Sequence, residues 1–471
     1  LPFKKRQLGS SSSLELFVAS TSMAHSFHER KAAIKEAFHK RLDEWKTWLT
    51  ECEKELNMGP DWNSFRDAPK VKGNKPLVCV AGLASSTLEA SFDDGKTFGV
   101  SYCSISALAS APETTLESLR MMETLGTLHD GRQVVSTCDS PGVIQRPLKG
   151  TAGISTLNPG EAIPVKVWKD LVDAMESKVN VHALNYDWRR FGDLVYMEEL
   201  EVLFHIEVEA AFDESEEKRV TLIGHSMGAP VILYCLSRLG EEWTKKYIEN
   251  VVLVAPAHVG SPCMLPSLAH GIINNEEKTS PYWGKSVDFP DFLNELDKGL
   301  GDLCATWPCM VAEMPVVVGG VKPWPADFVF AKTPTKEYKL LDLGAFLMKA
   351  AESEQGRLFP SNLFPSVVEM YDKMHAPHVP THIIYGDKID TISQVSYDTE
   401  DVTLPCTVTK NDPGDGTITA DSIKTVADAW TDQGHDIKLI ACPDTITHKN
   451  LIVAPMTIEY VSKLMGLAEG Q

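Results

Sequence analysis

One pentapeptide constrains the fold of this chain more than any other stretch, and it reads Gly224-His225-Ser226-Met227-Gly228. It follows an apolar run at residues 220–223 and precedes residues 229–236, in which apolar side chains recur at helical spacing. The pentapeptide therefore joins a buried strand to a helix. Glycines two residues before and two residues after Ser226 let the strand and the helix approach closely while the serine adopts a strained turn. Such a turn lifts the Ser226 hydroxyl off the sheet and points the helix N-terminus at it.

A Gly-x-Ser-x-Gly turn between a strand and a helix is the nucleophile elbow of the α/β-hydrolase fold. The rest of the chain agrees, because buried-strand patterns alternate with helical patterns from residue 167 onwards. We therefore predict an α/β-hydrolase fold, with a mainly parallel sheet covered by helices on both faces. The strand-like runs lie at residues 76–82, 181–186, 220–223, 251–256, 381–386 and 437–441.

Long segments that interrupt this alternation set the predicted domain organisation. Residues 75–257 and 376–471 are expected to form the hydrolase core, and residues 1–74 an N-terminal extension with one amphipathic helix. Within the core, residues 91–165 are rich in Gly, Ser and Thr and are predicted to form a lid-like insertion. Residues 258–375 carry many Pro, Trp and Gly residues and are predicted to form a cap insertion.

Charge and hydropathy restrict the partners of the chain. The formal charge of −20 at pH 7 excludes nucleic acid as a partner and argues against electrostatic docking on anionic lipid, but it leaves contact with a neutral lipid surface open. No run of about 18 apolar residues occurs, so we predict a soluble or peripheral protein without a transmembrane helix. Because the sequence begins at Leu1, it assigns no compartment. We expect no cofactor and no metal, since Cys304 and Cys309 lack a set of histidine partners.

A serine nucleophile needs a histidine base, and in this fold the base follows the last strand of the sheet. Among the histidines after residue 376, only His448 comes after the final strand-like run, on a loop that opens the C-terminal helix. Of the other three, His378 and His435 precede a strand-like run and His382 lies within one. The position of His448 therefore predicts that it is the base.

The acid that orients the base is less narrowly defined by spacing. Asp387 and Asp390 directly follow the strand-like run at residues 381–386, where many α/β-hydrolases carry the acid. Asp415 lies in a tight Gly414-Asp415-Gly416-Thr417 turn, in which the flanking glycines expose the carboxylate. Spacing alone leaves both Asp390 and Asp415 open.

Two turns are expected to supply the amides that stabilise a developing oxyanion. One is the elbow itself. The other follows the strand-like run at residues 76–82, which ends in Gly82 and continues into a turn of small residues, Leu83-Ala84-Ser85-Ser86-Thr87. An α/β-hydrolase places the second oxyanion amide in such a turn.

Several blocks of the sequence, in the right order between residues 76 and 465, resemble the lecithin:cholesterol acyltransferase family. That family includes lysosomal phospholipase A and phospholipid:diacylglycerol acyltransferase. The matching blocks are Val80-Ala81-Gly82 with Leu88-Glu89-Ala90, Tyr186-Asp187-Trp188-Arg189, the pentapeptide, Trp243-Thr244-Lys245-Lys246-Tyr247-Ile248, Ala255-Pro256 with Gly260, Thr333-Pro334-Thr335, and Gly414-Asp415-Gly416-Thr417.

The resemblance implies a role for each residue of the site. It implies that Ser226 is the nucleophile, His448 the base and Asp415 the acid, which decides against Asp390. It also implies that the backbone amides of Leu83 and Met227 form the oxyanion hole. The chain has Ala81 where the family usually has proline, but a backbone donor at the next turn does not depend on that side chain.

Two further parts of the pattern concern the lid and the block at residues 186–189. Relatives with a lid disulfide carry two lid cysteines that bracket aromatic residues; Cys103 and Cys138 correspond to them, but no tryptophan lies between these two. The sequence therefore leaves both their disulfide and a lipid-docking lid open. Within the lid-like insertion, only residues 114–128 are predicted to be a helix. We interpret residues 186–189 as a structural block, with Asp187 and Arg189 as an ion pair.

These inferences favour a lipid acyl-ester enzyme that works through a Ser-His-Asp triad and an acyl-serine. It would be a phospholipase A, an O-acyltransferase or both, with a phospholipid or other acyl lipid as substrate and a lipid hydroxyl or water as acceptor. One alternative is a serine esterase for small soluble esters. The other is an inactive lipid-binding module, which the presence of Ser226, Asp415 and His448 disfavours.

Overall fold

The computed structural model describes residues 70–71, 73–92, 99–100, 115, 117–159, 165–270, 303–352, 360–404 and 406–467. All of these belong to one compact unit. The predicted N-terminal amphipathic helix and Cys103 lie outside the described residues. Among the helices that are described, none combines the length and apolar character that a membrane crossing requires.

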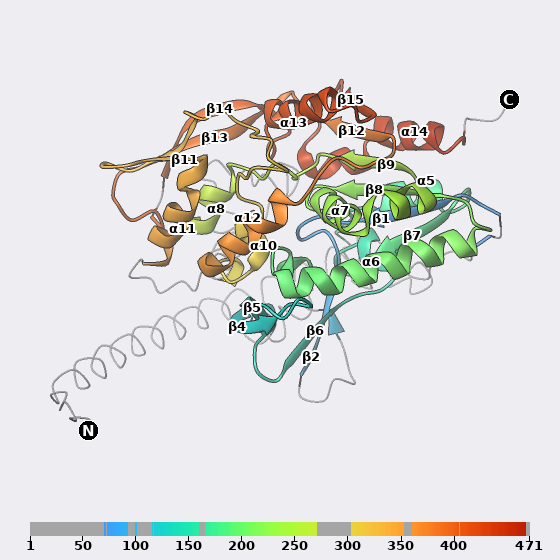
Figure 1. Cartoon of the computed structure of the whole chain (residues 1–471), viewed down its shortest axis with the longest axis horizontal. Coiled ribbons are helices and arrows are strands. Elements are labelled where there is room, and N and C mark those ends of the chain that lie inside the picture. The colour runs from blue at the N-terminus through green and yellow to red at the C-terminus, as the bar shows by residue number, and fades with distance from the viewer. Residues whose placement is uncertain are drawn as a thin grey trace, which may run out of the picture. The chain divides into compact units, whose positions relative to one another are not determined.

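A parallel sheet of six strands forms the centre of the described unit, in the order β15-β12-β9-β8-β1-β7 (Figure 1). Every neighbouring pair of strands in it is parallel. The strands β1, β7 and β8 are buried along their whole length, as expected when helices cover both faces of a parallel sheet. The bounds of the six strands are β1 Pro76–Val80, β7 Asn180–Leu184, β8 Val220–His225, β9 Ile248–Val254, β12 Thr381–Tyr385 and β15 Ile437–Ala441.

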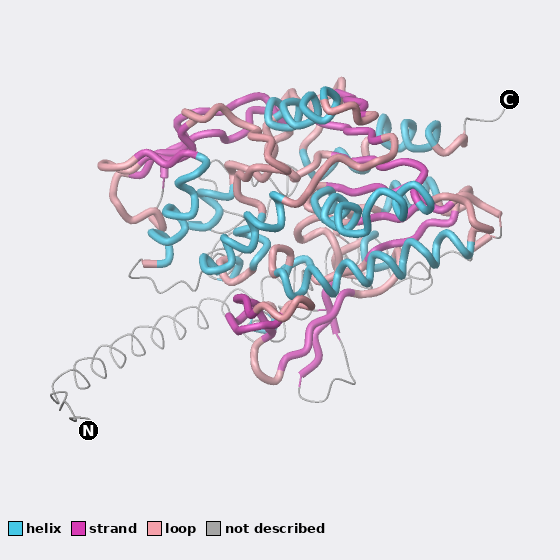
Figure 2. Tube along the Cα trace, in the orientation of Figure 1, coloured by secondary structure: helices cyan, strands magenta, loops and turns pink. Residues whose placement is uncertain are grey.

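Helices pack on both faces of this sheet (Figure 2). The strand β1 shows the two sides, because Val78 and Val80 belong to one hydrophobic core and Leu77 and Cys79 to the other. The first core includes side chains of α6, α7 and α13, and the second includes side chains of α5 and α14. Their bounds are α5 Lys169–Met175, α6 Leu194–Glu214, α7 Gly228–Tyr247, α13 Ala420–Asp432 and α14 Pro455–Leu464. This arrangement is the α/β-hydrolase fold and confirms the predicted fold class.

The segment predicted as a lid is largely β structure where it is described. Its elements are β2 Leu88–Phe92, β3 Gly99–Val100, β4 Met121–Thr127, β5 Gln133–Asp139, β6 Val143–Pro147 and the short helix α4 Ala152–Ser155. The predicted helix at residues 114–128 is wrong over residues 121–127, which form the strand β4 and pair antiparallel with β5. Gly126 and two threonines weaken a helix there, and seven cross-strand pairs outweigh the short helical pattern.

Described residues between 303 and 375, together with the strands β13 and β14, build a second sheet with helices beside it. This sheet has four strands in the order β11-β10-β13-β14, so it combines two strands from the predicted cap with two strands from residues beyond 375. The strands are β10 Val329–Lys332, β11 Glu337–Lys339, β13 Ile389–Tyr397 and β14 Cys406–Gly414. The remaining helical elements are η2 Trp188–Arg190, α8 Met264–His270, α10 Pro308–Ala312, η3 Leu340–Asp342, α11 Leu343–Ala351, η4 Pro360–Leu363, α12 Phe364–Asp372 and η5 His448–Val453.

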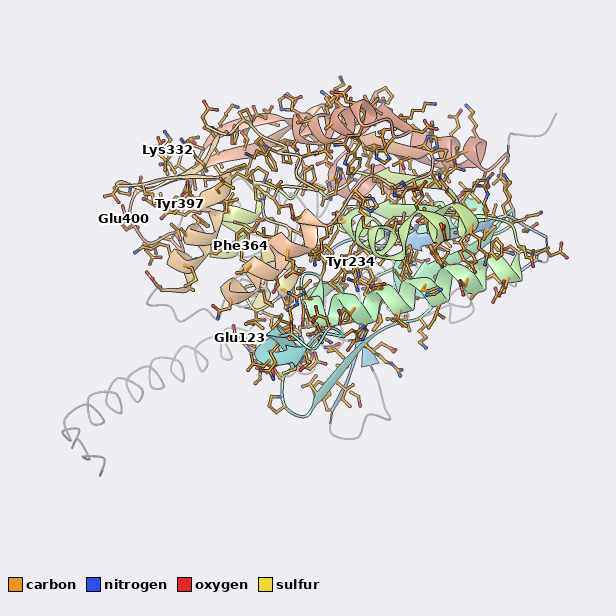
Figure 3. The ribbon with its side chains drawn as sticks, viewed as in Figure 1. Glu123, Tyr234, Lys332, Phe364, Tyr397 and Glu400 are labelled. Atoms are coloured by element: carbon orange, nitrogen blue, oxygen red, sulfur yellow. The ribbon has the colours of Figure 1, made fainter. Side chains whose placement is uncertain are left out.

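The loop Thr333-Pro334-Thr335 is one of the blocks on which the family resemblance rests. It connects β10 with β11 and is hydrogen-bonded to Glu400. The Glu400 carboxylate accepts hydrogen bonds from the Thr335 amide and hydroxyl, both 3.0 Å, and from the Thr333 hydroxyl at 3.2 Å. Glu400 and Lys332 lie at the same end of the sheet (Figure 3). These bonds fix the β10–β11 turn against the loop between β13 and β14.

Candidate active site

The nucleophile candidate Ser226 lies in a tight turn between β8 and α7. Its φ is 55°, in the left-handed region that a non-glycine residue adopts only under constraint. The constraint is close packing, because a Cβ atom on Gly228 would lie 2.1 Å from the Val80 carbonyl oxygen and one on Gly224 would lie 2.7 Å from Ile232 Cδ1. Only glycine fits at these two positions, as the pentapeptide predicted. The side chain of Ser226 is buried.

The base candidate His448 is the first residue of η5, after the last strand of the sheet. Its Nε2 atom lies 2.8 Å from Ser226 Oγ, and its Nδ1 atom lies 2.8 Å from Asp415 Oδ2. A carboxylate accepts hydrogen bonds and does not donate them, so Nδ1 carries the hydrogen and the Nε2 lone pair faces the serine hydroxyl. The structure therefore brings together Ser226 from the turn after β8, Asp415 from the β14–α13 turn and His448 from the loop after β15.

The acid candidate Asp415 is held by the turn that carries it. Its Oδ1 atom accepts the amides of Thr417 at 2.9 Å and Ile418 at 2.8 Å, which leaves Oδ2 for the imidazole of His448. The main chains are also joined, because the His448 amide donates to the Asp415 carbonyl oxygen at 2.8 Å. Both side chains are almost completely buried. Water therefore does not compete for these bonds.

The alternative acids lie elsewhere. Asp390 is exposed on β13, opposite Pro413 of β14. Asp387 lies 3.2 Å from the ammonium group of Lys388. Among the described residues, neither carboxylate bonds to His448.

The turn after β1 lies directly against the elbow. A Cβ atom on Gly82 would be 2.7 Å from Ser226 Cβ and 3.3 Å from the Met227 amide nitrogen. Within the described part of the chain, neither the Leu83 amide nor the Met227 amide donates a hydrogen bond, so both N–H groups are available to an oxygen beside Ser226. The N-terminus of α7 adds its positive potential at the same place.

The block at residues 186–189 supports that turn. The Tyr186 hydroxyl donates to the Ala81 carbonyl oxygen at 2.6 Å, and the Trp188 indole donates to the Ser86 carbonyl oxygen at 3.1 Å. These bonds hold the chain on both sides of Leu83. The fully buried guanidinium of Arg189 pairs with Asp187. The block therefore has the structural contacts that the sequence led us to expect.

Sequence reasoning missed two buried ionisable groups, one beside the nucleophile and one in the predicted cap. His225, beside the nucleophile, places Nε2 2.9 Å from the His448 carbonyl oxygen. Burial and the neighbouring His448 lower the pKa of His225 to about 3. Glu313 follows α10, and burial raises the pKa of its carboxyl well above the usual value. The only sequence signal for His225 was its place in the pentapeptide, and we find none for Glu313.

A metal site is not formed by the described residues. No group of three His, Cys, Asp or Glu side chains there is arranged to hold a metal ion. Among the described cysteines, Cys138 is exposed and Cys309 is buried, each without a disulfide, and Cys304 is also buried.

Comparison with known families gives the family of this chain. The family model for lecithin:cholesterol acyltransferase matches residues 114–355, about half of the chain. The chain belongs to the lecithin:cholesterol acyltransferase family. The matched region includes Ser226 and ends before Asp415 and His448. The grouping of the three side chains is therefore an observation separate from the family match.

Curated relatives of this family are similar over part of their length. The mouse phosphatidylcholine-sterol acyltransferase is 24% identical over 287 residues, which is 60% of this chain and 58% of the relative. The rat lysosomal phospholipase A and acyltransferase is 23% identical over 299 residues, which is 61% of this chain and 62% of the relative. In both cases the similarity spans less than two thirds of the relative's own length.

A solved structure agrees with the fold. The crystal structure of the Tle4–Tli4 complex contains a chain that matches with a TM-score of 0.50 at 11% sequence identity. The match covers 85% of this chain and all of that one. At this identity, the similarity supports the fold of this lecithin:cholesterol acyltransferase family member and nothing further.

Proposed function

We propose that this protein is a lipid acyl-ester enzyme in which Ser226, His448 and Asp415 form a catalytic triad. One observation carries the proposal: the His448 imidazole lies 2.8 Å from both Ser226 Oγ and Asp415 Oδ2. A nucleophile, a base within hydrogen-bond reach and an acid behind the base are what acyl transfer through a covalent serine requires.

The proposed first half-reaction follows from this geometry. His448 takes the proton from Ser226 as the hydroxyl oxygen attacks the ester carbonyl carbon, and Asp415 stabilises the imidazolium. The carbonyl oxygen becomes negative between the amides of Leu83 and Met227. One such donor contributes about 2.7–4 kcal/mol to transition-state stabilisation. His448 then gives its proton to the leaving alcohol, and an acyl-serine remains.

The acceptor decides the net reaction. His448 accepts a proton from water or from a lipid hydroxyl as its oxygen attacks the acyl-serine carbonyl carbon. The bond from that carbon to Ser226 Oγ then breaks, His448 returns the proton to Oγ, and either a fatty acid or a new ester leaves. The relatives named phosphatidylcholine-sterol acyltransferase and lysosomal phospholipase A and acyltransferase support a phospholipid as acyl donor. We propose that the chain is a phospholipase A, an O-acyltransferase or both.

We also propose that residues 91–165 and 258–375 act as lid and cap over this site. The support is a set of hydrogen bonds between them. The Met121 amide donates to the Thr306 hydroxyl at 3.1 Å, and the Trp307 indole donates to the Leu119 carbonyl oxygen at 2.7 Å. A lid and a cap joined in this way would exclude water from the acyl-serine, which transfer to a lipid hydroxyl requires.

A phospholipid in a bilayer must leave that bilayer to reach Ser226, so peripheral contact with a neutral lipid surface is part of the proposal. Leu125 and Met122 on β4 are exposed apolar side chains of the proposed lid that are suited to such contact. Co-sedimentation with phosphatidylcholine vesicles measures it. The Leu125→Ser/Met122→Ser variant should bind the vesicles less than the wild-type protein does.

The test of the activity has two parts. A fluorophosphonate probe should label the wild-type protein and not Ser226→Ala, which separates an enzyme from an inactive lipid-binding module. The wild-type protein is then incubated with phosphatidylcholine vesicles, with and without a sterol or a fatty alcohol. Fatty acid release means a phospholipase, and a new ester that depends on the acceptor means a transferase. Turnover of p-nitrophenyl butyrate with neither product would favour an esterase for small soluble esters.

A further inference from the structure

The base candidate is held through its main chain by a second histidine. The Nε2 atom of His225 lies 2.9 Å from the carbonyl oxygen of His448, and the centres of the two rings are 5.1 Å apart. The amide of His448 is held by the Asp415 carbonyl oxygen on its other side. Both main-chain polar groups of His448 are therefore hydrogen-bonded, the amide to Asp415 and the carbonyl oxygen to His225.

The protonation state of His225 is fixed by its surroundings. The side chain is 1% exposed, and burial together with His448 lowers its pKa to about 3, so the ring is neutral at any pH near 7. A carbonyl oxygen only accepts hydrogen bonds, so the single ring hydrogen is on Nε2. Among the described residues, Nδ1 has no hydrogen-bond partner. The bond to His448 is therefore the only polar contact of the ring with described residues.

The orientation of the ring is fixed by packing. The Trp168 indole meets the His225 imidazole edge-on, with ring centres 6.3 Å apart and an angle of 86° between the planes. Neither Trp168 nor His225 belongs to the proposed triad. A neutral donor suits this place, because a second cation would oppose the imidazolium that forms on His448 during the proposed reaction.

We infer that His225 is a positioning residue whose Nε2–H group holds the His448 carbonyl oxygen and so keeps the His448 imidazole between Ser226 and Asp415. This inference rests on the proposed function. His225 does not touch the reacting atoms, so its effect reaches them through His448. Removing the donor should allow the loop to shift, and a small displacement of the base lowers the rate of the chemical step more than it lowers substrate binding.

Three variants separate this role from simple filling of space. His225→Leu keeps most of the volume and removes the donor. His225→Gln places an amide donor where Nε2 lies, and His225→Asn carries the same amide on a shorter side chain. We expect kcat on p-nitrophenyl butyrate to fall about tenfold or more in His225→Leu and His225→Asn, with KM changed less than about twofold. We expect His225→Gln to recover most of kcat.

The control is a buried histidine in another contact. His182 on β7 lies 3.2 Å from Glu207 of α6 and is buried like His225. His182→Leu should lower the melting temperature without lowering the rate at which the fluorophosphonate probe labels Ser226. His225→Leu should lower that labelling rate in step with kcat, although probe labelling needs no bound lipid.

The outcomes are distinguishable from failure of the proposed function. If Ser226→Ala keeps the activity of the wild-type protein, the proposed triad is wrong. If Ser226→Ala is inactive but His225→Leu matches the wild-type protein in kcat and labelling rate, only the positioning role is overturned. Should His225→Leu fail to fold, equal kcat values for the Gln and Asn variants overturn the role, and a higher kcat for Gln supports it.

Discussion

Gly82 approaches Ser226 so closely that a Cβ atom on the glycine would lie 2.7 Å from the serine Cβ and 2.8 Å from the His225 carbonyl oxygen. Real Cβ atoms do not come so near to main-chain atoms. The turn after β1 and the elbow after β8 are therefore one packed unit, although about 140 residues separate them in the sequence. This contact places the turn that carries Leu83 beside the Met227 amide, as the proposed oxyanion hole requires.

The first prediction concerns this contact. Gly82→Ala should displace the Ser226 turn and lower kcat on p-nitrophenyl butyrate by about 100-fold, because small shifts of a nucleophile cost about that much. Overpacking should also lower the free energy of unfolding by about 1–3 kcal/mol. Gly99→Ala is the matched control, since a Cβ atom there would meet no heavy atom of the described residues within 4 Å. A Gly82→Ala protein as active as Gly99→Ala would contradict the proposed oxyanion site.

The positions of the strands and the elbow were predictable because buried parallel strands and glycine-flanked turns leave local patterns. The acid was not, since spacing offered both Asp390, just after the strand-like run at residues 381–386, and Asp415, in a glycine-flanked turn. The antiparallel pairing of β13 with β14 decides between Asp390 and Asp415, and in this pairing Ile389 lies opposite Gly414. That pairing folds the chain back and returns Asp415 to the end of the central sheet. Its register is set by contacts about 25 residues apart, which no local spacing reports.

The strand β4 was mispredicted for a related reason. Met121, Leu125 and Leu128 are spaced as on a helix, but Met121 and Leu128 are buried while Leu125 is exposed. The pairing with β5 decides the outcome there. A local pattern is reliable in this chain where the residues are buried by the central sheet, and it is less reliable in the insertions.

The second prediction tests the choice of acid. Asp415→Asn should lower kcat on the order of 10³–10⁴-fold, because the amide no longer holds the His448 tautomer whose Nε2 faces the serine. Asp390→Asn should leave kcat close to that of the wild-type protein, since Asp390 is exposed on β13. Steady-state hydrolysis of p-nitrophenyl butyrate measures both, with circular dichroism to show that each variant is folded. The reverse order of effects would make Asp390 the acid and remove Asp415 from the triad.

The third prediction concerns the buried carboxyl of Glu313. Burial raises its pKa well above the usual value in the folded protein, so the folded state holds a proton that the unfolded chain releases. Stability from this group is therefore fully present below pH 4.5 and is lost as the pH rises toward the raised pKa. Glu313→Gln carries no such proton and should lose less stability over that range.

Melting temperatures measured between about pH 5 and pH 8 check this prediction. The wild-type protein should lose stability relative to Glu313→Gln as the pH rises, by at most about 1.4 kcal/mol per pH unit for one proton. Glu242→Gln makes the same substitution at an exposed position of α7, and its melting temperature should change with pH as that of the wild-type protein does. If Glu313→Gln also runs parallel to it, then the Glu313 carboxyl is ionised in the folded protein.

The fourth prediction concerns the buried guanidinium that joins the proposed lid to the core. Arg189 bonds Asp187 at 2.9 and 2.6 Å, Asp139 at 2.7 Å and the Leu119 carbonyl oxygen at 3.0 Å. A lysine has no fork and cannot reach all of these acceptors. Arg189→Lys should therefore lower the free energy of unfolding by about 1–3 kcal/mol for each buried acceptor left without a donor.

Urea unfolding of Arg189→Lys and Arg132→Lys separates a buried network from an ordinary ion pair. Arg132 pairs with Glu369 and Asp130 on the surface, where lysine replaces it at little cost. Equal midpoints for the two variants would mean that the Arg189 network adds nothing beyond an exposed pair. A lower urea midpoint for Arg189→Lys would show that the buried network stabilises the fold more than the exposed pair does. If kcat also falls because Leu119 is no longer held, the network fixes the proposed lid and, through it, the turn that carries Leu83.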